Sequence, residues 1–89
     1  MLFEWDSAKE RSNRAKHGLD FRTAARVFLD PLLLEFEDDR EYGETRWIAI
    51  GAVEGRVLFV TYTERDDRCR IISARGAEPH ERRRYHHPV

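Results

Sequence analysis

The order of apolar and polar residues predicts a short strand and then a polar helix at the start of the chain. Residues 2–5 are rich in aromatic side chains, which is typical of a strand. A mostly polar helix follows over residues 8–17. It is expected to begin at Asp6 or Ser7, because Ser7 and Glu10 fit the pattern in which two side chains cap the first amides of a helix.

A second helix is expected to pack more deeply than the first. Gly18 ends the first helix, as a residue in the left-handed conformation can, and Asp20 caps the second. Apolar residues then recur at helical spacing, namely Phe21, Ala24, Ala25, Val27 and Phe28. Pro31 ends this segment, so residues 20–30 contribute a helix whose apolar side faces the core.

Four strands are predicted in the rest of the chain, over residues 32–36, 46–50, 57–63 and 68–75. An acidic loop over residues 37–44 joins the first two, and tight turns at Glu54-Gly55 and Asp66-Asp67 join the others. Residues 57–60 are apolar on both faces of their strand. That strand is therefore expected to be central and covered on both sides.

These elements predict one α+β domain over residues 1–89. Gly76 ends the last strand, and Pro79 lies in the first turn of a C-terminal helix, where proline is tolerated. The order is an N-terminal strand and two helices, then a four-stranded antiparallel meander and a C-terminal helix. Consecutive strands joined by short turns favour helices packed on one face of the sheet.

Size and composition restrict the kind of site this chain can carry. A chain of 89 residues has a modest core, so an active site is expected to be a shallow surface groove without a cofactor. The single cysteine, Cys69, excludes an internal disulfide and is expected to be buried and inert. No apolar run is long enough to cross a bilayer, which favours a cytoplasmic protein with no membrane contact.

The histidines do not suggest a metal site. His80, His86 and His87 lie near the C-terminus, and no cysteine or carboxylate is expected at ligand spacing around them. We therefore expect no bound metal.

Charge is distributed unevenly along the chain. Acids dominate residues 28–54, and arginines dominate from Arg65 onward. Arginines on the last predicted strand suit phosphate oxygens, although a solvated or salt-bridged face would explain them equally well. Regular alternation places Arg70 on one face and Ser73 and Arg75 on the other, and a bulge would bring them together.

Several short motifs resemble the BrnT family of toxins, in the same order along the chain. The resemblance is carried by Thr63-Glu64-Arg65, the run from Arg70 to Arg75, Glu81-Arg-Arg-Arg-Tyr85, Phe3-Glu-Trp-Asp6, Lys16-His-Gly18, Phe21, Phe28-Leu-Asp-Pro31, Glu44, Arg46 and Gly51. It implies a RelE-like fold and a ribonuclease that inhibits translation. It also implies a hetero-oligomer with a BrnA-like antitoxin, which would contact DNA and repress the promoter together with the toxin.

Cleavage of RNA without a metal requires a base, a group that stabilises charge on the phosphorane, and an acid for the leaving oxygen. The candidates for proton transfer are Glu64, His17 and Tyr85, and the positive charge of the last helix is expected to lower the pKa of Tyr85. Arg70 and Arg75 are the candidates for charge stabilisation. Further contacts to RNA are expected from Arg65, Arg68, Ser73, Arg82, Arg83 and Arg84.

Each of these residues also has a simpler interpretation. Glu64 would form an ion pair at its turn, His17 would stabilise the end of a helix, and Tyr85 would pack its ring on the sheet. Trp5, Trp47 and Tyr62 would stack RNA bases only if exposed, and core positions are the more common outcome for aromatic strand residues. A non-catalytic module that binds a partner and assists an antitoxin on DNA is the alternative function.

Overall fold

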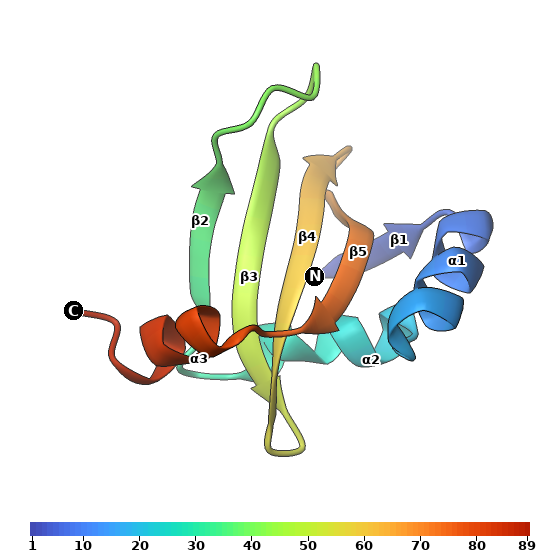
Figure 1. Cartoon of the computed structure of the whole chain (residues 1–89). Coiled ribbons are helices and arrows are strands. Elements are labelled where there is room, and N and C mark those ends of the chain that lie inside the picture. The colour runs from blue at the N-terminus through green and yellow to red at the C-terminus, as the bar shows by residue number, and fades with distance from the viewer.

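The computed structural model describes all 89 residues as three α-helices, one 3-10 turn and five strands (Figure 1). The elements are β1 (Leu2–Trp5), α1 (Ser7–His17), α2 (Phe21–Ala25), η1 (Arg26–Leu29), β2 (Leu34–Asp38), β3 (Arg46–Val53), β4 (Arg56–Arg65), β5 (Arg68–Gly76) and α3 (Pro79–His86). The α+β class and the element order predicted from the sequence are confirmed.

One five-stranded sheet forms the centre of the molecule, with strand order β1-β5-β4-β3-β2 (Figure 1). Strands β2 to β5 form the predicted antiparallel meander. The N-terminal strand β1 adds a fifth strand, parallel to β5, with Leu2 opposite Arg68 and Trp5 opposite Ile71. Strand β4 is central, as its apolar run predicts, because a strand that is apolar on both faces must be covered on both.

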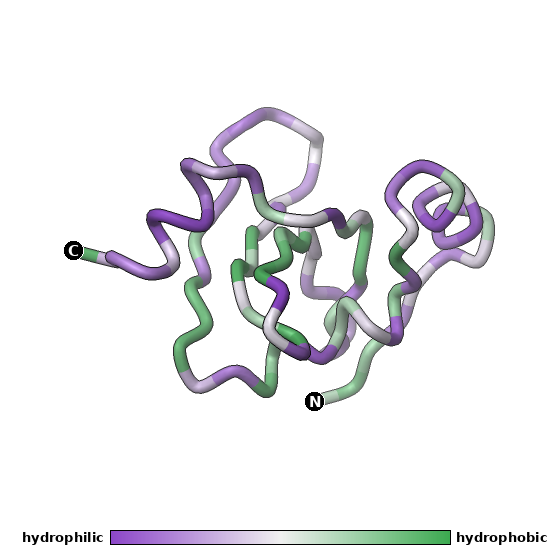
Figure 2. Tube along the Cα trace, turned by 60° about the horizontal axis from the view of Figure 1, so that its bottom comes forward, coloured by the Kyte–Doolittle hydropathy of each residue, from purple (hydrophilic) through white to green (hydrophobic).

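Helices cover both faces of the sheet, which corrects the expectation that all of them lie on one face. Helix α2 and the η1 turn bury Phe21, Ala24 and Val27 against the main core. Helix α3 lies across the opposite face and buries Tyr85 in a second cluster, together with Ala77, Ile48, Ile50 and Val57. Figure 2 shows the hydrophobic residues concentrated in the central strands, whereas α1 and α3 are mostly hydrophilic.

Local hydrogen bonds explain where the element boundaries differ from those predicted. Helix α1 is capped by Asp6, whose Oδ1 accepts from the amides of Ala8 and Lys9, so the expected Ser7 and Glu10 capping pair does not form. The Glu10 carboxylate instead accepts from the Phe21 amide and thereby joins α1 to the start of α2. As predicted, Asp20 caps α2 through the Thr23 amide.

The start of β2 is delayed by a turn at Asp30. The Asp30 side chain accepts from the Leu32 amide, and its carbonyl accepts from the Leu33 amide. Residues 31–33 are therefore held in this turn, and the strand begins at Leu34 rather than at residue 32. Strand β3 extends to Val53, three residues beyond the predicted end, because it pairs with β4 up to the turn at Glu54 and Gly55.

Asn13 joins the polar helix α1 to the sheet. The side chain is buried, and its Nδ2 donates to the carbonyls of Leu19 (3.0 Å) and Ala74 (2.8 Å). Its Oδ1 accepts from the Ala74 amide at 3.0 Å. Because β1 pairs with β5 only as far as Ile71, the Asn13 amide satisfies backbone groups of β5 that β1 does not reach.

No helix in the structure is both long enough and apolar enough to span a membrane.

Replacing Asn13 by alanine would leave the amide and carbonyl of Ala74 buried without partners. We expect Asn13→Ala to lower the free energy of unfolding by roughly 3 kcal/mol, because an unsatisfied buried polar group loses its full solvation. Urea unfolding followed by circular dichroism measures this effect. Ser12→Ala is the matched control, since Ser12 is exposed on the same helix. Equal stability of the two variants would contradict the role assigned to Asn13.

Candidate active site

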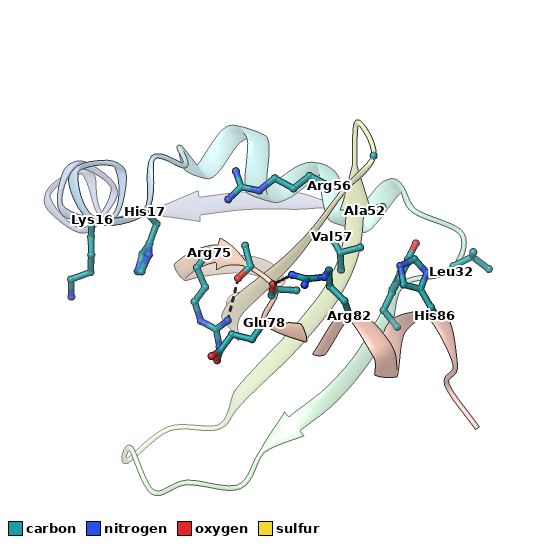
Figure 3. A pocket seen from close by; sticks show the side chains of 14 residues that line it. Lys16, His17, Leu32, Ala52, Arg56, Val57, Arg75, Glu78, Arg82 and His86 are labelled. Carbon is teal, nitrogen blue, oxygen red and sulfur yellow. Dashed lines mark hydrogen bonds and ion pairs between the residues drawn. The ribbon is translucent and has the colours of Figure 1, made fainter. Parts of the chain in front are cut away.

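An open groove of about 1150 Å³ is the largest hollow of the surface, and it is bordered by residues from both ends of the chain (Figure 3). It lies between the end of α1, the β3–β4 turn, the end of β5 and helix α3. Fourteen residues line it, and eight of them carry an ionisable side chain: Lys16, His17, Arg56, Arg75, Glu78, Arg82, Tyr85 and His86. The groove therefore has an excess of positive charge.

The end of α1 contributes Lys16 and His17, which are both exposed. Gly18 adopts φ 70°, ψ 18°, and its amide donates to the Arg14 carbonyl, so the helix ends directly after His17. Asn13 fixes this turn of the helix on β5, three residues before Lys16. His17 is thus one of the predicted residues that the fold does bring to the groove.

Arg56 enters the groove from the start of β4, directly after the turn formed by Glu54 and Gly55 (Figure 3). Both turn residues have positive φ angles, 51° and 81°, as tight hairpins require. None of the ion pairs in the structure involves Arg56, Lys16 or Arg82. These three cations are available to a ligand with negative charge.

Arg75 also lines the groove, but its guanidinium is bound to helix α3. Its Nη1 and Nη2 donate to the two carboxylate oxygens of Glu81 at 2.7 and 2.9 Å, and Glu78 lies 3.5 Å away. The guanidinium also stacks on Phe59, with 4.1 Å between its Cζ and the ring centroid. The guanidinium nitrogens of Arg75 that were expected to bind phosphate are therefore already partly used by Glu81.

The Arg75 and Glu81 pair is also part of the start of α3. Glu78 and Glu81 form a reciprocal capping pair, in which the Glu78 amide donates to Glu81 Oε1 at 2.8 Å. Burial would raise the pKa of Glu81, yet the hydrogen bonds from Arg75 and the Glu78 amide lower it. One carboxylate thus fixes the position of both the helix and the arginine.

Tyr85 packs its ring on the sheet, and its hydroxyl donates to Asp30 Oδ2. The same oxygen accepts from the Ala52 amide at 2.7 Å, so Asp30 connects α3 to β3. The hydrogen bond to Asp30, followed by burial, raises the pKa of Tyr85 to about 12. This is opposite to the expected lowering, because the arginines of α3 do not contact the phenol whereas a carboxylate does.

The remaining arginines of the hairpin share a face of the sheet but lie outside the groove. Strands β4 and β5 shift register between Thr61 and Tyr62, which makes Ile72 an extra residue. Arg70 and Arg75 consequently lie opposite Thr63 and Phe59, which share a face of β4. The bulge removes the objection that Arg70 points away from Ser73 and Arg75.

Arg70 is not near the groove, and it is paired with a carboxylate. It contacts Glu4 of β1 at 2.8 Å, and Arg68 lies 3.8 Å from the same residue. Glu64 lies opposite Cys69, five positions along β4 from the pair of Phe59 and Arg75. That separation is about 17 Å at the rise of a strand, so Glu64 does not meet His17, Arg75 or Tyr85 in one site.

The other predicted residues are distributed over several surfaces. Arg82 lines the groove and donates to the Ala77 carbonyl at 2.7 Å. Arg83 is exposed on α3 outside the groove lining, and Arg84 lies over the ring of Phe36. Ser73 and Arg65 also lie outside the groove, on the same sheet face as Arg70.

Four of the ionisable groove residues had no role assigned from the sequence, namely Lys16, Arg56, Glu78 and His86. Only two signals in the sequence could have indicated any of these residues. Lys16 lies next to His17, and Arg56 follows a tight turn. Burial of the three aromatics is partly as expected, since Tyr62 is buried and Trp5 and Trp47 pack against the main core. Burial raises the pKa of the Cys69 thiol to about 12, in agreement with an inert cysteine.

The surroundings of His80 correct one expectation about metals. Ligand atoms of Glu78, His80 and Glu81 lie within 4.8 Å of one another, so carboxylates do stand near this histidine. Glu81 is bound to Arg75 and to the Glu78 amide, and its oxygens are thus already used by protein donors. The cluster is explained by the start of α3.

The fold and the groove define a small α+β protein with a basic surface site. A family model described as "Ribonuclease toxin, BrnT, of type II toxin-antitoxin system" matches residues 5–81. The chain therefore belongs to the BrnT family of ribonuclease toxins. A search of curated proteins gives no match.

Glu81→Gln tests the link between the ion pair and helix α3. Because the pKa of Glu81 is lowered, its carboxylate stabilises the fold at pH values above the ordinary carboxyl pKa of 4.5. This contribution is lost as the pH falls through the lowered pKa. We expect Glu81→Gln to cost about 2 kcal/mol at pH 7 and much less at strongly acidic pH. Urea unfolding across pH measures the difference, and a cost that does not change with pH would contradict the assignment.

Proposed function

We propose that this chain cleaves RNA in the groove without a metal ion and thereby inhibits translation in the cytoplasm. The observation that carries the proposal is that three cations without carboxylate partners, Lys16, Arg56 and Arg82, line one open groove that His17 also lines. Phosphate oxygens satisfy such cations, and an open groove admits a flexible single strand. The family assignment supplies the reaction class.

Within this groove the residues divide into charge-stabilising and proton-transferring groups. Arg56 is the guanidinium that is free to stabilise negative charge on the phosphorane, and Lys16 and Arg82 bind neighbouring phosphates. His17 and Glu78 are exposed on the groove and are the groups assigned to proton transfer. Arg75 acts by holding Glu78 and Glu81 in position.

The residues outside the groove receive secondary roles in the proposal. Arg65, Arg68, Arg70 and Ser73 share one sheet face, and we assign them to the flanking parts of the RNA. Arg83 and Arg84 are exposed on α3 and add to the positive charge that attracts RNA. Tyr85 is assigned to the packing of α3, because its hydroxyl is bound to Asp30.

Cleavage of a fluorescently labelled single-stranded RNA in the presence of EDTA tests the proposal. We expect the wild-type chain to cleave, and His17→Ala and Arg56→Ala to lower the rate by about 100-fold or more, as is typical for loss of a proton-transfer or charge-stabilising group. Tyr85→Phe should retain the rate within a few-fold. Arg22→Ala is the charge-matched control, since Arg22 is exposed on α2 and outside the groove.

Two outcomes would count against this proposal. Cleavage that disappears with EDTA would contradict the metal-independent mechanism. RNA binding that weakens with salt, without cleavage products, would favour the alternative function of a non-catalytic module that assists an antitoxin on DNA. That alternative is supported by the pairing of Arg70 with Glu4 and of Arg75 with Glu81.

We further propose that a BrnA-like antitoxin neutralises the chain by covering the groove, and that DNA is contacted through the antitoxin during co-repression of the promoter. The positive groove fits an acidic segment of such a partner. We expect a stoichiometric antitoxin to abolish RNA binding, and Arg56→Ala with Arg82→Ala to weaken the complex about tenfold or more. Calorimetry measures the affinity, and undiminished RNA binding by the complex would contradict covering of the groove.

A gel-shift assay with promoter DNA, comparing the antitoxin with and without the toxin, tests co-repression.

A further inference from the structure

The position of Arg56 depends on the absence of a side chain at residue 76. A Cβ atom built on Gly76 would lie 2.8 Å from Arg56 Nη2, 3.4 Å from Nε and 3.5 Å from Cζ. Three atoms of the guanidinium group are thus close to one point, so the group lies across the backbone of Gly76. No other glycine in the chain has an arginine side chain above it.

The backbone itself does not require glycine at this position. Gly18, Gly43 and Gly55 have positive φ angles, whereas Gly76 does not. Gly76 ends β5 opposite Leu58 in an ordinary strand pairing. The space above its Cα atom, rather than its conformation, is the feature that Arg56 uses.

Nothing else in the structure holds the Arg56 guanidinium. Arg75 is fixed by Glu81 and Arg82 by the Ala77 carbonyl, whereas Arg56 has no carboxylate partner. In Figure 3 the Arg56 side chain extends from β4 toward the end of α1, where His17 and Lys16 project. The surface of Gly76 is therefore the support that directs this free guanidinium into the groove.

We propose that Gly76 is a positioning residue, which directs the Arg56 guanidinium along the groove that His17 also lines, for contact with the phosphate of the RNA. This inference rests on the proposed function, because it takes the groove as the RNA site. Alanine at residue 76 would displace the tip of Arg56, which is flexible, without changing the backbone. The rest of the groove would keep its arrangement.

A double-mutant cycle of Gly76→Ala and Arg56→Ala tests the proposal, with RNA cleavage rate and protein stability as readouts. We expect Gly76→Ala to lower the cleavage rate by about tenfold, since displacement of a reacting group by about 1 Å has effects of this order or larger. In the Arg56→Ala background the same substitution should have no further effect. Arg56→Lys should reduce the penalty of Gly76→Ala, because a slender ammonium clears the added methyl group.

A second readout does not depend on cleavage. The side-chain Nε–H signal of Arg56 in the NMR spectrum, assigned by its loss in Arg56→Lys, should shift in Gly76→Ala. An unchanged signal, or an equal loss of cleavage by Gly76→Ala in the Arg56→Ala background, would overturn the positioning role. If the signal shifts while neither wild type nor any variant cleaves RNA, the positioning role stands and the proposed ribonuclease site falls.

Discussion

The attachment of α1 to the sheet depends on the three hydrogen bonds of one buried amide, that of Asn13. Helix α1 has almost no apolar surface to bury, so hydrophobic packing alone would not hold it against β5. The Asn13 side chain bonds the Ala74 backbone in both directions and bonds the carbonyl of Leu19 as well. This contact sets where Lys16 and His17 stand relative to the end of β5.

The arginines of the C-terminal third have two different physical roles. Arg70 and Arg75 are held by Glu4 and Glu81, and these contacts join β1 to β5 and β5 to α3. Ion pairs in partly buried positions compensate the charge of each partner, and removal of one partner leaves the other without compensation. Arg56 and Arg82 carry no such partner, which is why the groove retains positive charge although the chain as a whole is nearly neutral.

Much of the fold could be predicted because it follows local rules. Asp20 and Pro79 start their helices as their chemistry predicts, and the run at residues 57–60 indicates the central strand. The same run also implied that both faces of the sheet are covered, which conflicts with the expectation of helices on one face. Pattern along the chain thus predicted the elements better than their layers.

The site could be predicted only in part, because it depends on contacts between distant residues. The sequence analysis named four residues that line the groove, His17, Arg75, Arg82 and Tyr85. No local pattern, however, distinguishes an arginine that is paired with a carboxylate, as Arg75 is with Glu81, from one that is free to bind phosphate. In the sequence, the bulge residue Ile72 cannot be distinguished from a residue at a regular strand position. The burial of Asn13 follows only from where β1 stops, and the importance of Gly76 follows only from the path of Arg56.

The pairing of β1 with β5 has a consequence for synthesis of the protein. The first strand finds its only neighbour some 66 residues later, as the contact between Leu2 and Arg68 shows. A nascent chain that has not yet reached Arg68 has no partner for β1, and Asn13 lacks its two bonds to Ala74 until that residue is made. Contacts so distant along the chain form late. The groove also needs α3, which follows β5 in the chain. The groove therefore cannot form while only the first half of the chain has emerged, because its lining includes residues of β5 and α3.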